Sequence, residues 1–274
     1  MSSYLISGAS RGIGWEFVRN LSRNPSNTII GLVRNKPATD ERAAKELSDR
    51  KNVHFVQGDI TDVKSLKAAA AETSKITGGA LDYLIGNGAW LTFDDAFDGP
   101  SALDQKDPQA FEELLLNNFK TNCIGNIHLF STFISLILKG TVKKVIHISS
   151  GHAETDLAVN LGVHVQSAYA ISKIAANMAT AKFSIEYAKE GVLFLNLCPG
   201  VVDTGHYDKM TEEQLALQAP MFQKFQEYAP SFKGPRPVDI AVEDVLAVIE
   251  KSSVENGDSG KFYSHKGDTK TWIS

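Results

Sequence analysis

A tyrosine and a lysine stand four residues apart in the stretch 167–173, whose pattern predicts a helix. Residues at positions i and i+4 lie on one helix face, so the phenol of Tyr169 and the ammonium of Lys173 can point into the same space. A free tyrosine has a pKa of about 10, and a nearby cation favours the phenolate and lowers that pKa. The pair therefore predicts a proton-exchanging tyrosine, although such pairs also arise by chance.

The elements that must position this pair are short β-branched runs that alternate with amphipathic stretches. The runs are 4–7, 28–33, 53–57, 81–85, 144–149, 192–198 and 261–264. This alternation is typical of βαβ units and a parallel sheet. The sequence therefore predicts an α/β fold. We expect residues 1–274 to form a single Rossmann-type doubly wound domain, with seven parallel strands and helices on both faces.

A glycine-rich turn follows the first run, and Ile13, Phe17 and Leu21 then recur every four residues, as in a helix. Glycines let the backbone approach a pyrophosphate closely, and a helix N-terminus supplies free N–H groups. Strand, turn and helix occur in the required order, which favours a phosphate site over a plain turn. The predicted cofactor contacts in this turn are Gly8, Ser10, Arg11, Gly12, Ile13 and Gly14.

The end of the second run predicts the type of dinucleotide. A site specific for NAD usually places a carboxylate here, whereas arginine suits the 2′-phosphate of NADP. Arg34 stands at this point, and Arg11 adds a second positive group. NADP (NADPH) is therefore favoured over NAD, with a solvated strand-end cation as the alternative for Arg34. Asp59, after the third run, could accept from an adenine amino group, and Asp62 is the predicted N-cap of the next helix.

Four further stretches carry expectations about loops and helices. Residues 90–108 predict a long surface loop with a solvated acidic face, because their spacing fits no calcium loop. Residues 111–138 predict one long apolar helix, in which some of the interrupting amides have a specific task. The stretch from 151 to Tyr169 predicts a loop with surface histidines at His152 and His164. Residues 203–237, rich in Met, Pro and aromatics, predict a lid over an apolar pocket, or alternatively a dimer contact or local packing.

The composition bounds the class of protein. The chain is 43% hydrophobic with a net charge of −4, which gives no electrostatic reason to bind nucleic acid. No signal peptide is visible, and no segment approaches the roughly 18 apolar residues of a membrane helix. Cys123 and Cys198 have no metal-ligand spacing. We therefore expect a cytoplasmic protein with a small-molecule partner and without a metal, a nucleic-acid partner or a membrane.

Together the motifs resemble the short-chain dehydrogenase/reductase family, in order and rough spacing. They are Ser-Gly-Ala-Ser-Arg-Gly-Ile-Gly at 7–14, Asp59, Gly-Asn-Gly-Ala at 86–89, Asn122, Ser149-Ser150, Tyr169-x-x-x-Lys173 and Pro199-Gly200. Within the family the chain is most similar to the carbonyl-reductase branch with C-factor and Sniffer-like proteins and fungal polyketide ketoreductases. The resemblance implies hydride transfer between NADP and a ketone or secondary alcohol.

The resemblance also implies roles for single residues. Tyr169 would be the general acid/base, Lys173 would lower its pKa and bind the nicotinamide ribose, and Ser150 would hydrogen-bond the substrate carbonyl. Asn122 would hold a water in a proton relay, and Thr204 would meet the carboxamide. The cofactor contacts implied beyond the glycine turn are Arg34, Asp59, Ile60, Asn87, Gly88, Tyr169, Lys173, Pro199, Gly200, Val202 and Thr204. A homodimer or homotetramer through the helices at 111–138 and 168–190 is implied as well.

Some alternatives remain open at this point. The family's usual Asn-Asn-Ala-Gly is here Gly-Asn-Gly-Ala, and the interval between Ser150 and Tyr169 is longer than the family norm. Either Ser149 or Ser150 could therefore face the substrate. A non-redox dehydratase or epimerase, and a cofactor-binding sensor or scaffold, are the other functions considered. An intact set of Ser, Tyr, Lys and Asn argues against the sensor.

Overall fold

Seven parallel strands form one central sheet in the order β3-β2-β1-β4-β5-β6-β7. The computed structural model describes residues 1–205, 208 and 210–274. The strands are β1 (Ser3–Ser7), β2 (Thr28–Val33), β3 (Val53–Gln57), β4 (Tyr83–Gly86), β5 (Lys144–Ile148), β6 (Leu193–Cys198) and β7 (Phe262–Ser264). The predicted fold and its seven strands are confirmed, with strand ends shifted by at most two residues.

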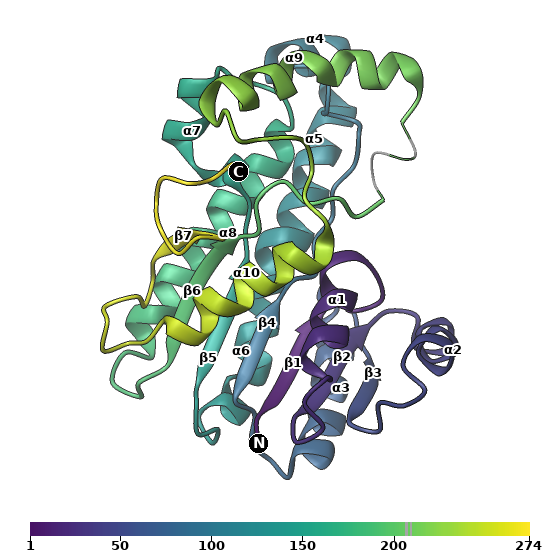
Figure 1. Cartoon of the computed structure of the whole chain (residues 1–274), viewed down its shortest axis with the longest axis vertical. Helices are drawn as coiled ribbons and strands as arrows, with labels where there is room; N and C mark the ends of the chain where they lie inside the picture. The colour runs from purple at the N-terminus through teal and green to yellow at the C-terminus, as the bar shows by residue number, and fades with distance from the viewer. Residues whose placement is uncertain (206–207, 209) are drawn as a thin grey trace.

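Helices cover both faces of the sheet (Figure 1). They are α1 (Gly12–Leu21), α2 (Lys36–Glu46), α3 (Val63–Thr77), α4 (Pro100–Lys106), α5 (Pro108–Asn118), α6 (Gly125–Ile137), α7 (Thr155–Leu161), α8 (Ser167–Glu186), α9 (Glu212–Tyr228) and α10 (Val238–Lys251). None of those in the described part of the chain is long and apolar enough to cross a membrane.

Successive side chains of a strand point to opposite sides of the sheet. Because helices cover both sides, the strands are buried on both faces. Ile6 of β1 packs in one apolar cluster with Phe17 of α1 and Val245 of α10. Its neighbour Leu5 packs in the other cluster, with Phe133 of α6. The sheet is thus held between two helical layers, and its carboxyl edge is left to bind ligands.

The strand order reverses between β1 and β4, so a crevice for ligands is expected where these two strands end. At their opposite end, Asp82 joins the start of β1 to the turn before β5. Its carboxylate accepts from the backbone N–H of Ser3 and of Thr141, each at 2.9 Å. Burial alone would raise the pKa of Asp82, but these hydrogen bonds outweigh burial and lower it.

The predictions of a loop at 90–108 and from 151 to Tyr169 were partly wrong, because each stretch contains a helix. Pro100 and Pro108 begin α4 and α5, since proline is favoured in a first helical turn, where its missing N–H is not needed. The stretch after β5 forms a 3₁₀ turn, Gly151–Ala153, and then α7. The predicted long helix is also modified, because α5 and α6 are joined by a π-helical turn, Phe119–Ile124.

Candidate active site

The glycine-rich turn after β1 lies against the loop after β4. A Cβ on Gly8 would come within 2.8 Å of the Gly88 Cα, and one on Gly14 within 2.3 Å of the Gly8 carbonyl oxygen. The Asn87 side chain donates to the Ser7 carbonyl oxygen at 3.0 Å. We call this assembly, residues 8–14 with Asn87 and Gly88, the cradle. The sequence predicted both of its parts, and the structure brings them together.

The cradle ends at the N-terminus of α1, which has no side-chain cap. The first N–H groups of an uncapped helix lack partners and favour an anion such as a pyrophosphate. Gly8 and Gly12 have φ values of 67° and 55°, which glycine adopts without strain. Arg11, at the N-cap, and Arg34, after β2, are both exposed to solvent. These two cations stand at the start of α1 and after β2, and no acidic residue occupies position 34.

Two predicted cofactor contacts and one predicted N-cap follow β3, and their surroundings differ. Asp59 accepts from the backbone N–H and the hydroxyl of Thr61, both at 2.8 Å. Ile60 is buried, and its side chain fills the space beside Gly88 and Gly125. Asp62 is the N-cap of α3, as predicted. Asp59 and Ile60 remain predicted cofactor contacts.

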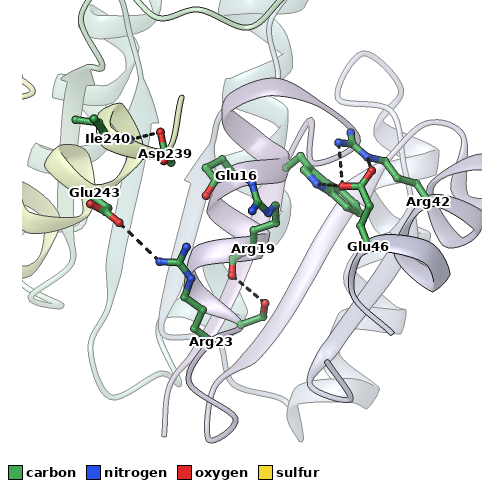
Figure 2. Close-up of polar contacts among 10 residues, drawn as sticks. Glu16, Arg19, Arg23, Arg42, Glu46, Asp239, Ile240 and Glu243 are labelled. Atoms are coloured by element: carbon green, nitrogen blue, oxygen red, sulfur yellow. Dashed lines mark hydrogen bonds and ion pairs between the residues drawn. The ribbon is translucent and has the colours of Figure 1, made fainter. Parts of the chain in front are cut away.

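Arg42 of α2 supports the cradle and was missed by the sequence analysis. Its guanidinium lies 4.1 Å from the centroid of the Trp15 ring and donates to the Ser10 carbonyl oxygen at 3.0 Å. Figure 2 shows Arg42 pointing to Glu46, to which Trp15 also donates at 3.0 Å. The i, i+4 pair was visible in the sequence, but the contacts with Trp15 and Ser10 were not. Arg42 is thus already engaged, whereas Arg34 forms no hydrogen bond or ion pair with the residues that the structure describes.

The helix that carries the tyrosine and lysine is fixed by a buried aspartate. Asp95 is only 1% exposed, and its carboxylate accepts from the Ala168 N–H at 2.8 Å, at the start of α8. The expected solvated face is therefore wrong for Asp95, although Asp94, Asp98, Asp104 and Asp107 are exposed. Burial raises the pKa of Asp95. The reason for the error is a contact over 73 residues, which local spacing does not reveal.

Ser150 and Tyr169 meet at the wall of a cavity. Ser150 hydrogen-bonds Tyr169, and both line the cavity. Ser149 is buried, its hydroxyl has no hydrogen-bond partner among the described residues, and it lies outside the lining. The structure thus places Ser150, rather than Ser149, on this side. The expected low pKa of Tyr169 is not found. Burial raises it to about 12, and the Ser150 hydrogen bond lowers it only in part.

Lys173 is 1% exposed, and its ammonium points to β5 rather than to the phenol. Nζ donates to the Ile148 carbonyl oxygen at 2.6 Å and lies 3.2 Å from the His147 Nε2. It is 5.9 Å from the centroid of the Tyr169 ring. Burial lowers the pKa of Lys173 to about 7. In this arrangement the cation does not offset the effect of burial on Tyr169, which corrects the sequence-based expectation.

Asn122 lies in the π-helical turn and is fully buried. Its amide donates to the Ser172 hydroxyl at 2.9 Å and to the Trp90 carbonyl oxygen at 2.9 Å. Its Oδ1 accepts from the Trp90 N–H at 2.7 Å. Asn118 and Asn126 also form hydrogen bonds inside the helix. The prediction that these amides have specific tasks is confirmed, while the relay role of Asn122 remains a prediction.

The cavity beside Tyr169 has a volume of about 180 Å³. Its walls are mostly apolar and come from the loop after β4, α7, α9 and the C-terminal tail, through Phe93, Leu157, Leu161, Met221, Phe225 and Trp272. Figure 1 shows α7 and α9 beyond the carboxyl edge of the sheet. No charged side chain lines the cavity among the described residues.

The predicted stretch 203–237 contributes to this cavity through α9, whose N-terminus carries a capping box formed by Thr211 and Gln214. Its residues 206, 207 and 209 lie outside the described part of the chain. Before it, Pro199 is buried, while Gly200 and Val202 line the cavity. The Thr204 methyl lies 3.4 Å from where a Cβ on Gly12 would be. Thr204 therefore borders the cradle as well.

Of the two histidines expected at the surface, only His164 is exposed. His152 is half-buried and lines the cavity, with its ring centroid 6.3 Å from that of Tyr169. Burial lowers its pKa to about 4, so the imidazole is neutral at neutral pH. The prediction for His152 was wrong because the 3₁₀ turn after β5 directs the ring inward.

A family model described as "short chain dehydrogenase" matches residues 3–215. The chain belongs to the short-chain dehydrogenase family. As a short-chain dehydrogenase it is an oxidoreductase that acts on CH–OH and C=O groups and binds a nicotinamide dinucleotide, NAD or NADP. The bare glycines of the cradle and the uncapped start of α1 fit the pyrophosphate of such a cofactor.

Relatives of this short-chain dehydrogenase match along its whole length. It is 49% identical over 273 residues to the short chain dehydrogenase virK of Hypocrea virens, covering 100% of both chains. It is 46% identical to the short-chain dehydrogenase/reductase iacC of Pestalotiopsis fici, again over 100% of both. Among solved structures, an NADPH-bound carbonyl reductase from chicken fatty liver has a TM-score of 0.76 at 25% identity, covering 98% of both chains.

Proposed function

We propose that this short-chain dehydrogenase is an NADP-dependent carbonyl reductase that reduces an uncharged, apolar ketone. The observation that carries the proposal is the Ser150–Tyr169 pair at the wall of a cavity whose described lining has no charged side chain. A carboxylate or phosphate in such a cavity would lose its hydration without a compensating partner. A neutral ketone meets no such penalty there.

Two of the chain's own groups would act on the substrate oxygen, and a third would hold the ribose of the cofactor. Ser150 donates a hydrogen bond to the carbonyl, and Tyr169 donates its proton as negative charge develops on that oxygen. A pKa of about 12 keeps the Tyr169 phenol protonated at neutral pH, which favours reduction over alcohol oxidation. Lys173 would bind the ribose through an N–H group that forms no hydrogen bond with β5. When bound, the reduced nicotinamide supplies the hydride.

The preference for NADP is supported by two exposed arginines, Arg11 at the start of α1 and Arg34 after β2, near which the adenosine end would lie. An arginine can bind a phosphate with two parallel hydrogen bonds. The carbonyl reductase from chicken fatty liver, which is similar over nearly the whole chain, is bound to NADPH. No carboxylate stands at the end of β2 to repel a 2′-phosphate.

We also propose that the protein forms a homodimer through α8. Its outer face exposes a stripe at helical spacing: Ile171 (51%), Ile174 (40%), Met178 (60%) and Ile185 (70%). Apolar patches of this kind mark interaction sites, and an isologous helix pair would cover this one. A Met178→Lys variant is expected to elute as a monomer in size-exclusion chromatography. A wild-type monomer would contradict the proposal.

The decisive experiment measures the loss of NADPH absorbance against a panel of ketones, quinones and aldehydes. We expect turnover with apolar aryl ketones and little with carboxylated ones. Conversion of a substrate without a change in NADPH would instead indicate a dehydratase or an epimerase. Binding of NADPH with no turnover of any carbonyl compound would favour the sensor or scaffold.

A further inference from the structure

One wall of the cavity carries a polar side chain that lacks a partner. Gln218 of α9 is 4% exposed, and its Oε1 is buried without a hydrogen bond in the described part of the chain. A buried amide that forms no hydrogen bond costs free energy, so native proteins rarely leave one unpaired. Gln218 also lines the cavity. A ligand in the cavity is therefore a natural partner for its carboxamide.

The size and walls of the cavity indicate the kind of ligand. Its volume of about 180 Å³ is similar to that of an apolar protein cavity of about 150 Å³ that binds benzene. Phe93, Phe225 and Trp272 offer aromatic faces. His152 adds a neutral imidazole whose ring nitrogens form no hydrogen bond with other described residues. One aromatic ring that bears a small polar group fits this combination.

We propose that Gln218 binds a hydroxyl group on the aromatic ring of the substrate and so selects hydroxyaryl ketones. This inference rests on the proposed carbonyl-reductase function. The carboxamide can both donate to and accept from a hydroxyl, whereas a ring without this group would leave the amide unpaired. Sites built to hydrogen-bond a substrate discriminate strongly against analogues that lack the group.

The test compares 1-tetralone with its monohydroxylated isomers as substrates. We expect wild-type enzyme to prefer at least one hydroxylated isomer by roughly tenfold in kcat/KM. In Gln218→Leu this preference should fall to about twofold or less, whatever the change in kcat/KM for 1-tetralone itself. Gln223→Leu, the same change at an exposed position of α9, should keep the preference.

The outcomes separate the two proposals. If Gln218→Leu reduces both kinds of ketone with an unchanged preference, Gln218 has no such role, and the proposed function stands. The same conclusion follows if all ketones lose activity equally. If wild-type enzyme reduces no ketone at all, the proposed function and this inference both fail.

His147 of β5 is fully buried behind Lys173. The Asn196 amide donates to the Lys261 carbonyl oxygen at 3.3 Å, which turns its Oδ1 towards the His147 Nδ1, 3.0 Å away. Because Oδ1 can only accept, Nδ1 carries the proton. The Nε2 of His147 is then left with a lone pair, which faces the Lys173 ammonium.

The ammonium has few other groups to stabilise its charge. Lys173 Nζ has three N–H donors, of which Ile148 and His147 take two. The titratable groups that face it are His147 from β5, Cys198 from β6 and Tyr169 from α8. No carboxylate pairs with Lys173 among the described residues. The imidazole is therefore the side-chain acceptor that compensates the buried charge.

We infer that His147 is a positioning residue that keeps Lys173 protonated and leaves one of its N–H groups for the ribose. Burial and the neighbouring ammonium hold the pKa of His147 well below its usual value, so it remains a neutral acceptor. Without this acceptor Lys173 would lose its proton more readily. Activity that requires the ammonium would then decline at a lower pH.

The test is the pH dependence of kcat in His147→Leu and His147→Gln. We expect the alkaline loss of activity to shift down by about one pH unit in His147→Leu. In His147→Gln the side-chain oxygen can still accept, so the profile should resemble that of wild type. A uniform fall of kcat at every pH in His147→Leu, without a shift, would overturn the inference.

Folding of each variant is checked by thermal unfolding. Asn196→Ala leaves the imidazole in place but frees it to rotate, so it should give a smaller shift in the same direction. This variant keeps the inference testable if His147→Leu does not fold. An Asn196→Ala profile that matches wild type would also count against the inference.

Discussion

The cradle and the cavity lie at the same edge of the sheet but are built in different ways. The cradle consists of backbone and glycines, and its parts come from the ends of two adjacent strands, β1 and β4. The cavity consists of side chains from the loop after β4, α7, α9 and the tail at Trp272. Backbone geometry thus forms the proposed cofactor region, and long-range side-chain packing shapes the proposed substrate region.

Because of this difference, variants in the two regions should affect different ligands. A change in the cradle alters the path of the backbone and should affect the cofactor first. A change in the cavity should affect the ketone and leave the cofactor bound. Tyr169 lies between the two regions, so its removal should affect the chemical step alone.

The largest effect is expected for Tyr169→Phe, which removes the proposed proton donor and keeps the ring. We expect kcat to fall by about a thousandfold, because general acid catalysis typically contributes 10²–10⁴-fold. NADPH affinity, measured by fluorescence titration, should stay within about twofold of wild type. Turnover at the wild-type rate would reject the proposed mechanism.

The next effect is expected for Gly8→Ala, whose new Cβ would meet the Gly88 Cα at 2.8 Å. We expect the Kd for NADPH to rise by about 100-fold, since small displacements in a site can cost that much. Gly191→Ala is the matched control, because its φ of 68° equals that of Gly8 within 1° and nothing lies within 4 Å. Equal losses in both variants would mean that backbone strain, not the close approach, matters.

A smaller effect is expected for Arg34→Ala. The Kd for NADPH should rise by roughly tenfold, as for the loss of one charged hydrogen bond, while the Kd for NADH stays the same. Binding of both cofactors is measured by titration at constant salt. Similar losses for NADPH and NADH would contradict the assignment of Arg34 to the 2′-phosphate.

The smallest effect is expected for Asp268→Ala in the C-terminal tail. Asp268 accepts from the Thr271 N–H at 2.7 Å and its hydroxyl at 2.6 Å, next to Trp272 in the cavity wall. We expect the KM for the ketone to rise about threefold with no change in NADPH affinity. A larger loss of NADPH binding than of ketone binding would break the distinction between the two regions.

The pH dependence of this tail has a definite sign. Burial would raise the pKa of Asp268, but hydrogen bonds led by Thr271 outweigh burial and lower it to about 2. The stabilisation is therefore present above the unfolded pKa of about 3.9 and is lost as the pH falls through about 2. Thermal unfolding of wild type and Asp268→Ala between pH 5 and 2 should converge at the acid end.

The same contrast explains what could be predicted from the sequence. The runs 28–33 and 53–57 match β2 and β3 at both ends, because β-branched composition and burial act locally. The cradle was predictable because its glycines are required by the backbone itself. Asp62 was predictable as an N-cap for the same reason.

The parts that were missed depend on contacts between distant segments. Asp95 caps α8 across 73 residues, and His152 turns into the cavity only because of the 3₁₀ turn after β5. The pKa of Tyr169 was predicted to fall because the i, i+4 spacing places Lys173 on the same helix face. Spacing does not show that the ammonium is drawn to His147 and Ile148 instead.

The π-helical turn at Phe119–Ile124 has a consequence for insertions and deletions. A π turn holds one more residue than the α-helical turn it replaces, and each residue of an α-helix rotates the chain by about 100°. Deletion of one residue here would restore a regular helix, because a π turn accommodates its extra residue with little rotation of the flanking helices. The residues within the turn would then face new directions, and Asn122 is expected to lose its contacts with Trp90 and Ser172. A one-codon deletion within the turn should therefore disturb the site more than a point substitution on the exposed face of this helix.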